Sequence, residues 1–193
     1  MGRIELLPGF AFFLAWLAWL GGAELFWWYL VAAALHEAAH AAAIYLFGGR
    51  ILKVRLGFGD AYLRTSLLPP RAAFWCALTG PAVNLLCALT LGRAVPAFAA
   101  ISLLLGAYNL LPVWPLDGGR MVNSLLTTLF PAARAERLCC VIGAVACAGL
   151  LGVGVWLYAV RGAGIWPLFA AGCLTVRVIS LRVGARYSVR SMG

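Results

Sequence analysis

Hydrophobic residues in this 193-residue chain fall into long runs that polar residues interrupt only at intervals. A helix needs about 20 predominantly apolar residues to cross the hydrocarbon layer of a membrane. Runs near this length predict an all-α polytopic membrane protein with six transmembrane helices. The expected spans are 8–21, 25–47, 72–91, 96–113, 138–160 and 163–182. The first run is short for a full crossing, and it can extend back towards Ile4.

The segment from Arg50 to Thr65 has a different pattern. Apolar residues alternate there with charged residues or glycine, as Leu52, Val54, Leu56 and Phe58 against Lys53, Arg55 and Gly57. A period of two is typical of a β-strand, and Gly59-Asp60 then favours a turn. We therefore expect a short β-hairpin at the cytoplasmic membrane surface. It is either a surface loop without a partner or an edge strand that can pair with an extended polypeptide.

Composition places the chain outside the soluble class. Hydrophobic residues make up 64% of it, charged residues make up only 11%, and the mean hydropathy is +0.96. Soluble domains carry roughly 25% charged residues. No polar stretch is long enough for a separate soluble domain, so residues 1–193 are expected to form one membrane domain. The six cysteines lie in apolar segments without a Cys-x-x-Cys pair, which favours free thiols that pack as small hydrophobes.

Charge predicts the orientation of the spans. A net charge of +9 can indicate nucleic-acid binding, but the apolar bulk favours a role in membrane topology, with no nucleic-acid partner. Cytoplasmic loops of membrane proteins are enriched in Lys and Arg. With six spans and the N-terminus inside, every basic residue except Arg93 and Arg161 falls on the inner side. This inner group includes Arg177, Arg182, Arg186 and Arg190 near the C-terminus. Both termini are therefore expected in the cytoplasm.

The two histidines of the chain, His36 and His40, stand four residues apart inside the second expected span. Residues four apart share one face of a helix, so both imidazoles can reach one metal ion. Glu37, beside the first histidine, can take a proton from water that a metal activates. Ionisable residues inside a membrane usually serve a function, although buried histidines can also be hydrogen-bonded core residues. The pattern indicates a zinc hydrolase within a membrane.

A catalytic zinc ion normally takes three protein ligands, and the chain has no third histidine. Among its six acidic residues, Asp117 is the best candidate, because the arginine-based topology places it on the same side as the histidines. It follows Pro112 and Pro115, which cannot continue a regular helix, so non-helical backbone is expected there. The alternative is an aspartate that ends a helix at the membrane surface.

These motifs carry a family resemblance. His36-Glu37-x-x-His40, followed by Asn109-x-x-Pro112-x-x-Pro115-Leu116-Asp117-Gly118, resembles the site-2 protease family of intramembrane zinc metalloproteases, and Gly80-Pro81-Ala82-Val83-Asn84 matches a further family motif. The resemblance implies zinc (Zn2+) bound by His36, His40 and Asp117, with Glu37 as general base. It also implies that Asn84 positions the substrate or the oxyanion. The six-span layout is most similar to the stage IV sporulation protein FB branch.

The resemblance further implies a prokaryotic cell-membrane enzyme, with a cytoplasmic active-site opening. It would hydrolyse a peptide bond in or near the transmembrane segment of a membrane-tethered substrate, such as a sigma-factor precursor in sporulation. We expect a single intramembrane protease domain over residues 1–193 without a PDZ or CBS domain, and hence control by a regulatory membrane protein. The sequence is also compatible with a homo-oligomer. The alternative function is a non-catalytic metal-binding scaffold or a transporter, although the spans offer no continuous polar route across the bilayer.

Overall fold

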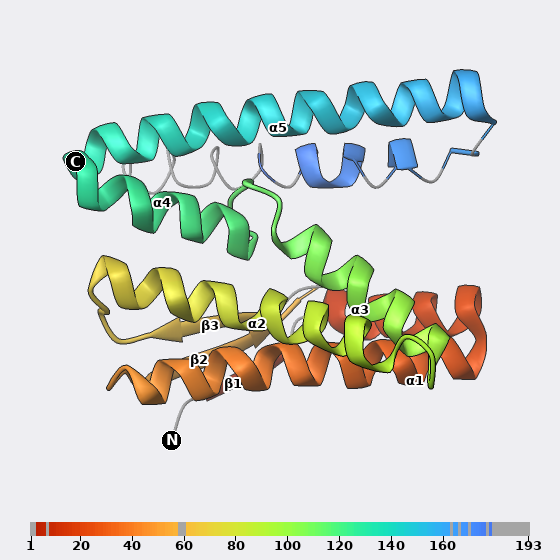
Figure 1. Ribbon diagram of the computed structural model, residues 1–193, viewed down its shortest axis with the longest axis horizontal. Coiled ribbons are helices and arrows are strands. Elements are labelled where there is room, and N and C mark those ends of the chain that lie inside the picture. Colours follow the sequence, from red (N-terminus) through yellow and green to blue (C-terminus); the bar gives the residue numbers. More distant parts are fainter. Residues whose placement is uncertain are drawn as a thin grey trace. The chain divides into compact units, whose positions relative to one another are not determined.

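Helices dominate the computed structural model, which describes residues 3–6, 8–57, 61–162, 164–165, 167–169, 171–176 and 178 (Figure 1). The chain divides into two compact units, Met1–Leu110 (unit 1) and Leu111–Gly193 (unit 2). In chain order the elements are β1 (Arg3–Leu6), α1 (Pro8–Leu46), β2 (Ile51–Leu56), β3 (Ala61–Thr65), α2 (Pro70–Leu91), α3 (Pro96–Asn109), α4 (Asp117–Leu129) and α5 (Ala132–Arg161).

Helix α1 is two helical segments that fold back on each other at Gly22. This glycine has φ 65° and ψ −179°, a conformation that side-chain-bearing residues rarely adopt. A straight helix of 39 residues would be about 58 Å long. The strands before and after α1 are nevertheless paired, and the rings of Phe13 and Tyr29 lie 5.4 Å apart between centroids. The expected break between the runs 8–21 and 25–47 is therefore present.

Three strands form one small sheet in the order β1-β2-β3. Strands β2 and β3 pair antiparallel, as expected for the hairpin, whose turn residues 58–60 lie outside the described residues. Strand β1 pairs parallel with β2, so the first helical span does not extend back to Ile4 as the sequence suggested. Glu5 of β1 binds Lys53 of β2 at 2.6 Å, and its other oxygen lies 3.8 Å from Arg55. These ion pairs help to hold a four-residue strand in place.

The helices of unit 1 pack against one another and against the sheet. Helices α1, α2 and α3 are in mutual contact, and α1 also touches β2 (Figure 1). A core cluster joins Ala43 and Ile44 of α1 to Cys76 of α2, and Ile51 of β2 and Leu63 of β3 pack onto it. The sheet is thereby fixed against the last turns of α1.

Unit 2 is built on the contact between α4 and α5. Its core cluster joins Val113 and Leu116, which precede α4, to Cys147 of α5 and to Leu174 and Val178. A Cβ on Gly119 would lie 2.7 Å from the Val113 carbonyl oxygen, so only glycine lets the segment before α4 lie against its first turn.

Within the described residues, three helices are long and apolar enough to cross a membrane: Gly22–Leu46, Pro70–Leu91 and Ala132–Arg161. The expectation of six transmembrane helices is not confirmed. The expected span 96–113 is the shorter helix α3, which ends at Asn109 before Pro112. The part of α1 before Gly22 is also short. The expected span 163–182 contains the apolar stretch Pro167–Val176, but Arg177, Arg182, Arg186 and Arg190 lie outside the described residues.

Candidate metal centre

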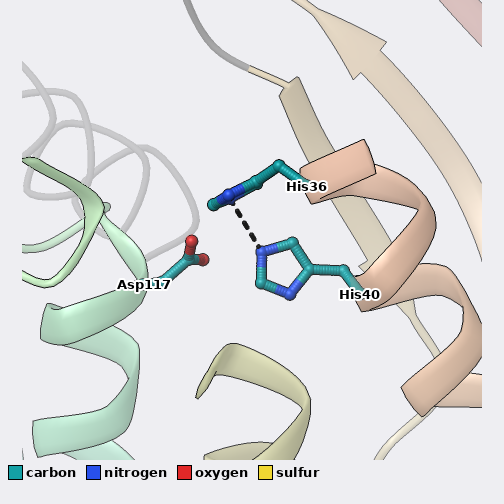
Figure 2. A group of neighbouring side chains, drawn as sticks. All are labelled: His36, His40 and Asp117. Carbon is teal, nitrogen blue, oxygen red and sulfur yellow. Dashed lines mark hydrogen bonds between the residues drawn. The ribbon is translucent and has the colours of Figure 1, made fainter. Parts of the chain in front are cut away.

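The two histidines point their ring nitrogens at each other from successive turns of α1. The Nε2 atoms of His36 and His40 lie 3.1 Å apart, and both side chains are at least 95% buried (Figure 2). Two nitrogens at 2.0–2.1 Å from a tetrahedral zinc ion would be about 3.3 Å apart. The pair therefore fits a shared metal ion without rearrangement of the helix.

A backbone carbonyl of α2 fixes the orientation of one imidazole. His40 Nδ1 lies 2.7 Å from the carbonyl oxygen of Cys76. Because a carbonyl can only accept, Nδ1 must carry the proton and donate, which leaves a lone pair on Nε2. Metal-binding histidines commonly donate their other N–H in this way, which fixes the ring and increases its basicity as a ligand. His40 is thus in the tautomer that binds metal through Nε2.

Gly80 allows α2 to approach the histidine pair. A Cβ at this position would meet His40 Nε2 and would lie 2.8 Å from His36 Nε2, the two atoms that would bind the metal. Gly80 is buried, and Pro81 follows it inside the helix. Only a residue without a side chain leaves room for both imidazoles here.

Thr79 adds a second polar contact at the same carbonyl. Its hydroxyl lies 2.9 Å from the Cys76 oxygen and 3.2 Å from the Ala39 oxygen, so it can donate to either. The second of these contacts crosses from α2 to α1 beside His40. Thr79 therefore helps to hold the carbonyl that orients the imidazole.

The variant Thr79→Val should weaken zinc binding by about tenfold, because ligand-orienting contacts of this kind typically contribute 10- to 100-fold. Valine keeps the shape and removes the hydroxyl. Competition with a chromophoric chelator measures the affinity, and Thr79→Ser, which keeps the hydroxyl, is the matched control. Equal affinities for all three proteins would show that the contact has no such role.

The remaining predicted residues of unit 1 lie on the same two helices. Glu37 follows His36 on α1 and is partly exposed. Asn84 lies one turn after Gly80 on α2 and is 1% exposed. Glu37 is thus the neighbour of a histidine on α1, and Asn84 lies one turn from the glycine of α2 that faces both histidines.

Asp117 belongs to unit 2, where it is the first residue of α4. It is buried, and its Oδ1 lies 3.5 Å from Arg120 Nη1 one turn later. A carboxylate at a helix N-terminus is stabilised by the helix dipole. The alternative of a helix-ending aspartate is wrong, because Asp117 begins a helix. Helix α4 has no clear signal in the residue pattern, since its first turn contains the pair Gly118-Gly119.

Sequence reasoning missed two contributors to this site, the Cys76 carbonyl and Thr79, and gave Gly80 no role. A main-chain carbonyl leaves no signature in the residue type. The pair Gly80-Pro81 inside an apolar span was the available signal, since both residues disfavour a regular helix interior.

Comparisons with known proteins define the class. Residues 91–150, a range that contains Asp117 but neither histidine, match the model of Peptidase family M50. The fold is that of the site-2 protease from Methanocaldococcus jannaschii, with a TM-score of 0.70 and 21% identity, over 93% of this chain and 91% of that one. Together with the 33% identity to Rip3 described next, these matches show that the chain belongs to the site-2 protease family, and they single out no branch within it.

Two relatives in particular resemble the chain. Rip3 of Mycobacterium tuberculosis, named as a candidate zinc metalloprotease, is 33% identical over 188 residues, which cover 81% of this chain and 46% of Rip3. The zinc metalloprotease MJ0392 of Methanocaldococcus jannaschii is 24% identical over 134 residues, or 63% of this chain and 40% of that protein. The chain thus spans less than half the length of these relatives.

Proposed function

We propose that this chain is an intramembrane zinc metalloprotease that hydrolyses a peptide bond in or near the transmembrane segment of a membrane-tethered protein. One observation carries the proposal. His36 and His40 direct both Nε2 atoms to one point, with His40 held in the metal-binding tautomer, inside a helix long and apolar enough to cross a membrane. The name of Rip3 and the M50 match agree with this activity.

The proposed zinc ligands are His36 and His40 of unit 1 and Asp117 of unit 2. Two imidazoles and one carboxylate are a common donor set of catalytic zinc. When bound, zinc supplies the Lewis acidity that makes water a nucleophile near neutral pH.

The protein side chains would then share the remaining tasks. Glu37 would accept the proton of the attacking water and pass it to the leaving amine. Asn84 would donate a hydrogen bond to the substrate carbonyl or to the oxyanion that forms from it. A helical substrate must unwind locally first, because its carbonyls are otherwise held in internal hydrogen bonds.

Zinc removal tests the proposal directly. A purified chain should cleave a membrane-tethered test substrate, lose cleavage on chelation and regain it with Zn2+. The variant Asp117→Asn should bind zinc at least about tenfold more weakly, because a neutral amide replaces the charged ligand. Asn123→Asp, a charge change on the same helix α4, is the control and should leave zinc affinity unchanged. Zinc bound normally by Asp117→Asn would remove Asp117 from the ligand set.

The finer assignments extend the same proposal. We propose that the active site opens to the cytoplasm of a prokaryotic cell, with both termini on that side, supported by the distribution of basic residues. A sigma-factor precursor in sporulation is the proposed substrate, and a membrane protein the proposed regulator, supported only by the motif layout.

We further propose that β3 offers the substrate a strand edge. The central strand β2, which contains Val54, is paired on both sides, so β3 has the outer edge of the hairpin. Ser66 N donates to Arg50 O, across the hairpin. Because successive residues alternate in direction, the N–H of Thr65 points away from β2, towards a possible partner strand. Leu63 of the same strand packs on the cluster that contains Cys76, close to His40.

The variant Thr65→Pro should reduce cleavage by about tenfold or more while zinc content stays unchanged, because proline removes one outward hydrogen-bond donor. Thr65→Val, which keeps the N–H and the β-branched shape, is the matched control. Substrate turnover and zinc content are measured on the same preparations. Full activity of Thr65→Pro would exclude pairing at this edge.

A further inference from the structure

Two polar side chains in the interior of unit 1 have hydrogen-bonding atoms that the described residues leave unsatisfied. They are Nδ2 of Asn84 on α2 and Oγ of Ser102 on α3. Asn84 is 1% exposed and Ser102 is fully buried. Buried polar groups are nearly always hydrogen-bonded, by protein or by ordered water, so each of these atoms calls for a partner.

The packing of α1 against α2 sets the level at which Asn84 lies. The two histidine contacts with α2 show that these helices run antiparallel past each other. One turn beyond those contacts, the same register brings Ala32 of α1 level with Asn84 of α2. Ala32 has no exposed surface and a side chain of one carbon. The side chain of Ala32 has no polar atom, so it cannot supply a hydrogen-bond partner for the Asn84 amide.

Helix α3 contacts both α2 and α1, and Ser102 is one of its buried residues. A Cβ on Gly106 would lie 3.2 Å from the Asn84 Cβ, so α3 is close to α2 there. One turn earlier on the buried face of α3 is Ser102, and one turn earlier again is Phe98, whose ring lies 5.6 Å from that of Trp28 on α1. Ser102 thus lies on the face of α3 that meets both other helices.

We propose that Asn84 and Ser102 together bind one water molecule inside unit 1, and that this water holds the Asn84 amide in place beside the histidine pair. Lipid chains cannot hydrogen-bond these atoms, whereas a buried water typically makes about three hydrogen bonds to such groups. The water can accept from the amide nitrogen and exchange a hydrogen bond with the hydroxyl. Ser102 is then a positioning residue that acts through water on Asn84.

The positioning role rests on the proposed function, but the water site does not. An amide that must meet a carbonyl oxygen or an oxyanion is effective only in a fixed orientation. With its amide anchored from behind by the water, Asn84 is pre-organised for that contact. Loss of the Ser102 hydroxyl would leave the amide free to turn.

A double-mutant cycle on the full chain in detergent tests the water site. Ser102→Ala and Asn84→Ala should each lower the apparent melting temperature. The decrease in the double variant should be clearly smaller than the sum of the two single decreases, because both substitutions remove the same water. Ser124→Ala removes another buried serine hydroxyl, in unit 2, and its shift should add to that of Asn84→Ala. Additive shifts for Ser102 and Asn84 would overturn the shared water site.

Cleavage kinetics test the positioning role. Ser102→Ala should lower kcat about tenfold with KM and zinc content unchanged, and Ser102→Thr, which keeps the hydroxyl, should retain the rate. In the Asn84→Ala background, Ser102→Ala should have no further effect, and a multiplicative loss would overturn the role. Non-additive melting shifts in a chain that cleaves no substrate would overturn the protease proposal and leave the water site standing. Additive shifts in an active protease would sink the water site alone.

Discussion

Replacement of Glu37 by glutamine should abolish proteolysis while zinc stays bound. The amide has nearly the size of the carboxylate but cannot accept the proton of the attacking water, and loss of a general base typically costs 10²- to 10⁴-fold in rate. Glu37 lies beside His36 on α1 and is not one of the proposed metal ligands, so the metal site should persist. Zinc content and cleavage of a tethered substrate are measured on one preparation.

The same helix provides the control for this experiment. Glu24→Gln makes the identical chemical change at an exposed position of α1, three turns before the site, and should leave both zinc and cleavage unchanged. Glu37→Gln protein that retains zinc and the wild-type rate would exclude a protease that uses this carboxylate. Loss of zinc and cleavage together would instead show that Glu37 is needed to hold the metal.

The second large effect is expected at Gly80. The added methyl of Gly80→Ala would collide with the Nε2 atoms of both histidines and push at least one imidazole out of position. Ligand-shell disturbances of this type cost at least 10- to 100-fold in metal affinity. Alanine is about 1 kcal/mol better than glycine in a helix interior, so the loss cannot be assigned to a weaker helix. A zinc titration of Gly80→Ala should show strongly weakened binding, and cleavage of the substrate should be lost.

A matched glycine exists on α5. A Cβ at Gly152 would meet nothing within 4 Å, so Gly152→Ala should bind zinc and cleave substrate as the wild type does. Wild-type zinc affinity in Gly80→Ala would contradict the close approach of α2 to the histidines and, with it, the geometry of the centre.

The parts of the fold that follow from local patterns could be predicted from the sequence. The alternation between Arg50 and Thr65 led to the hairpin, and the apolar runs led to α2, α5 and the broken α1. Strand β1 could not be found, because four residues show no periodicity and their pairing partners stand about fifty residues later in the chain.

The candidate site divides in the same way. The histidine pair could be predicted from the sequence, because a spacing of four residues places both rings on one face of α1. The groups that orient them come from α2, and a carbonyl or a missing side chain acts through tertiary contact that no local pattern encodes. The role of Ser102 could not be predicted at all, because a single serine in an apolar helix has no distinctive pattern and only the structure shows that it is buried.

The parallel alignment of β1 with β2 also determines sidedness. Whatever the absolute orientation of the molecule in the bilayer, the polypeptide that enters α1 and the polypeptide that leaves it emerge at one and the same leaflet. Glu5 of β1, paired with Lys53 of β2, ties the start of α1 to the segment that follows it, and β2 and β3 in turn pack through Ile51 and Leu63 on the last turns of α1.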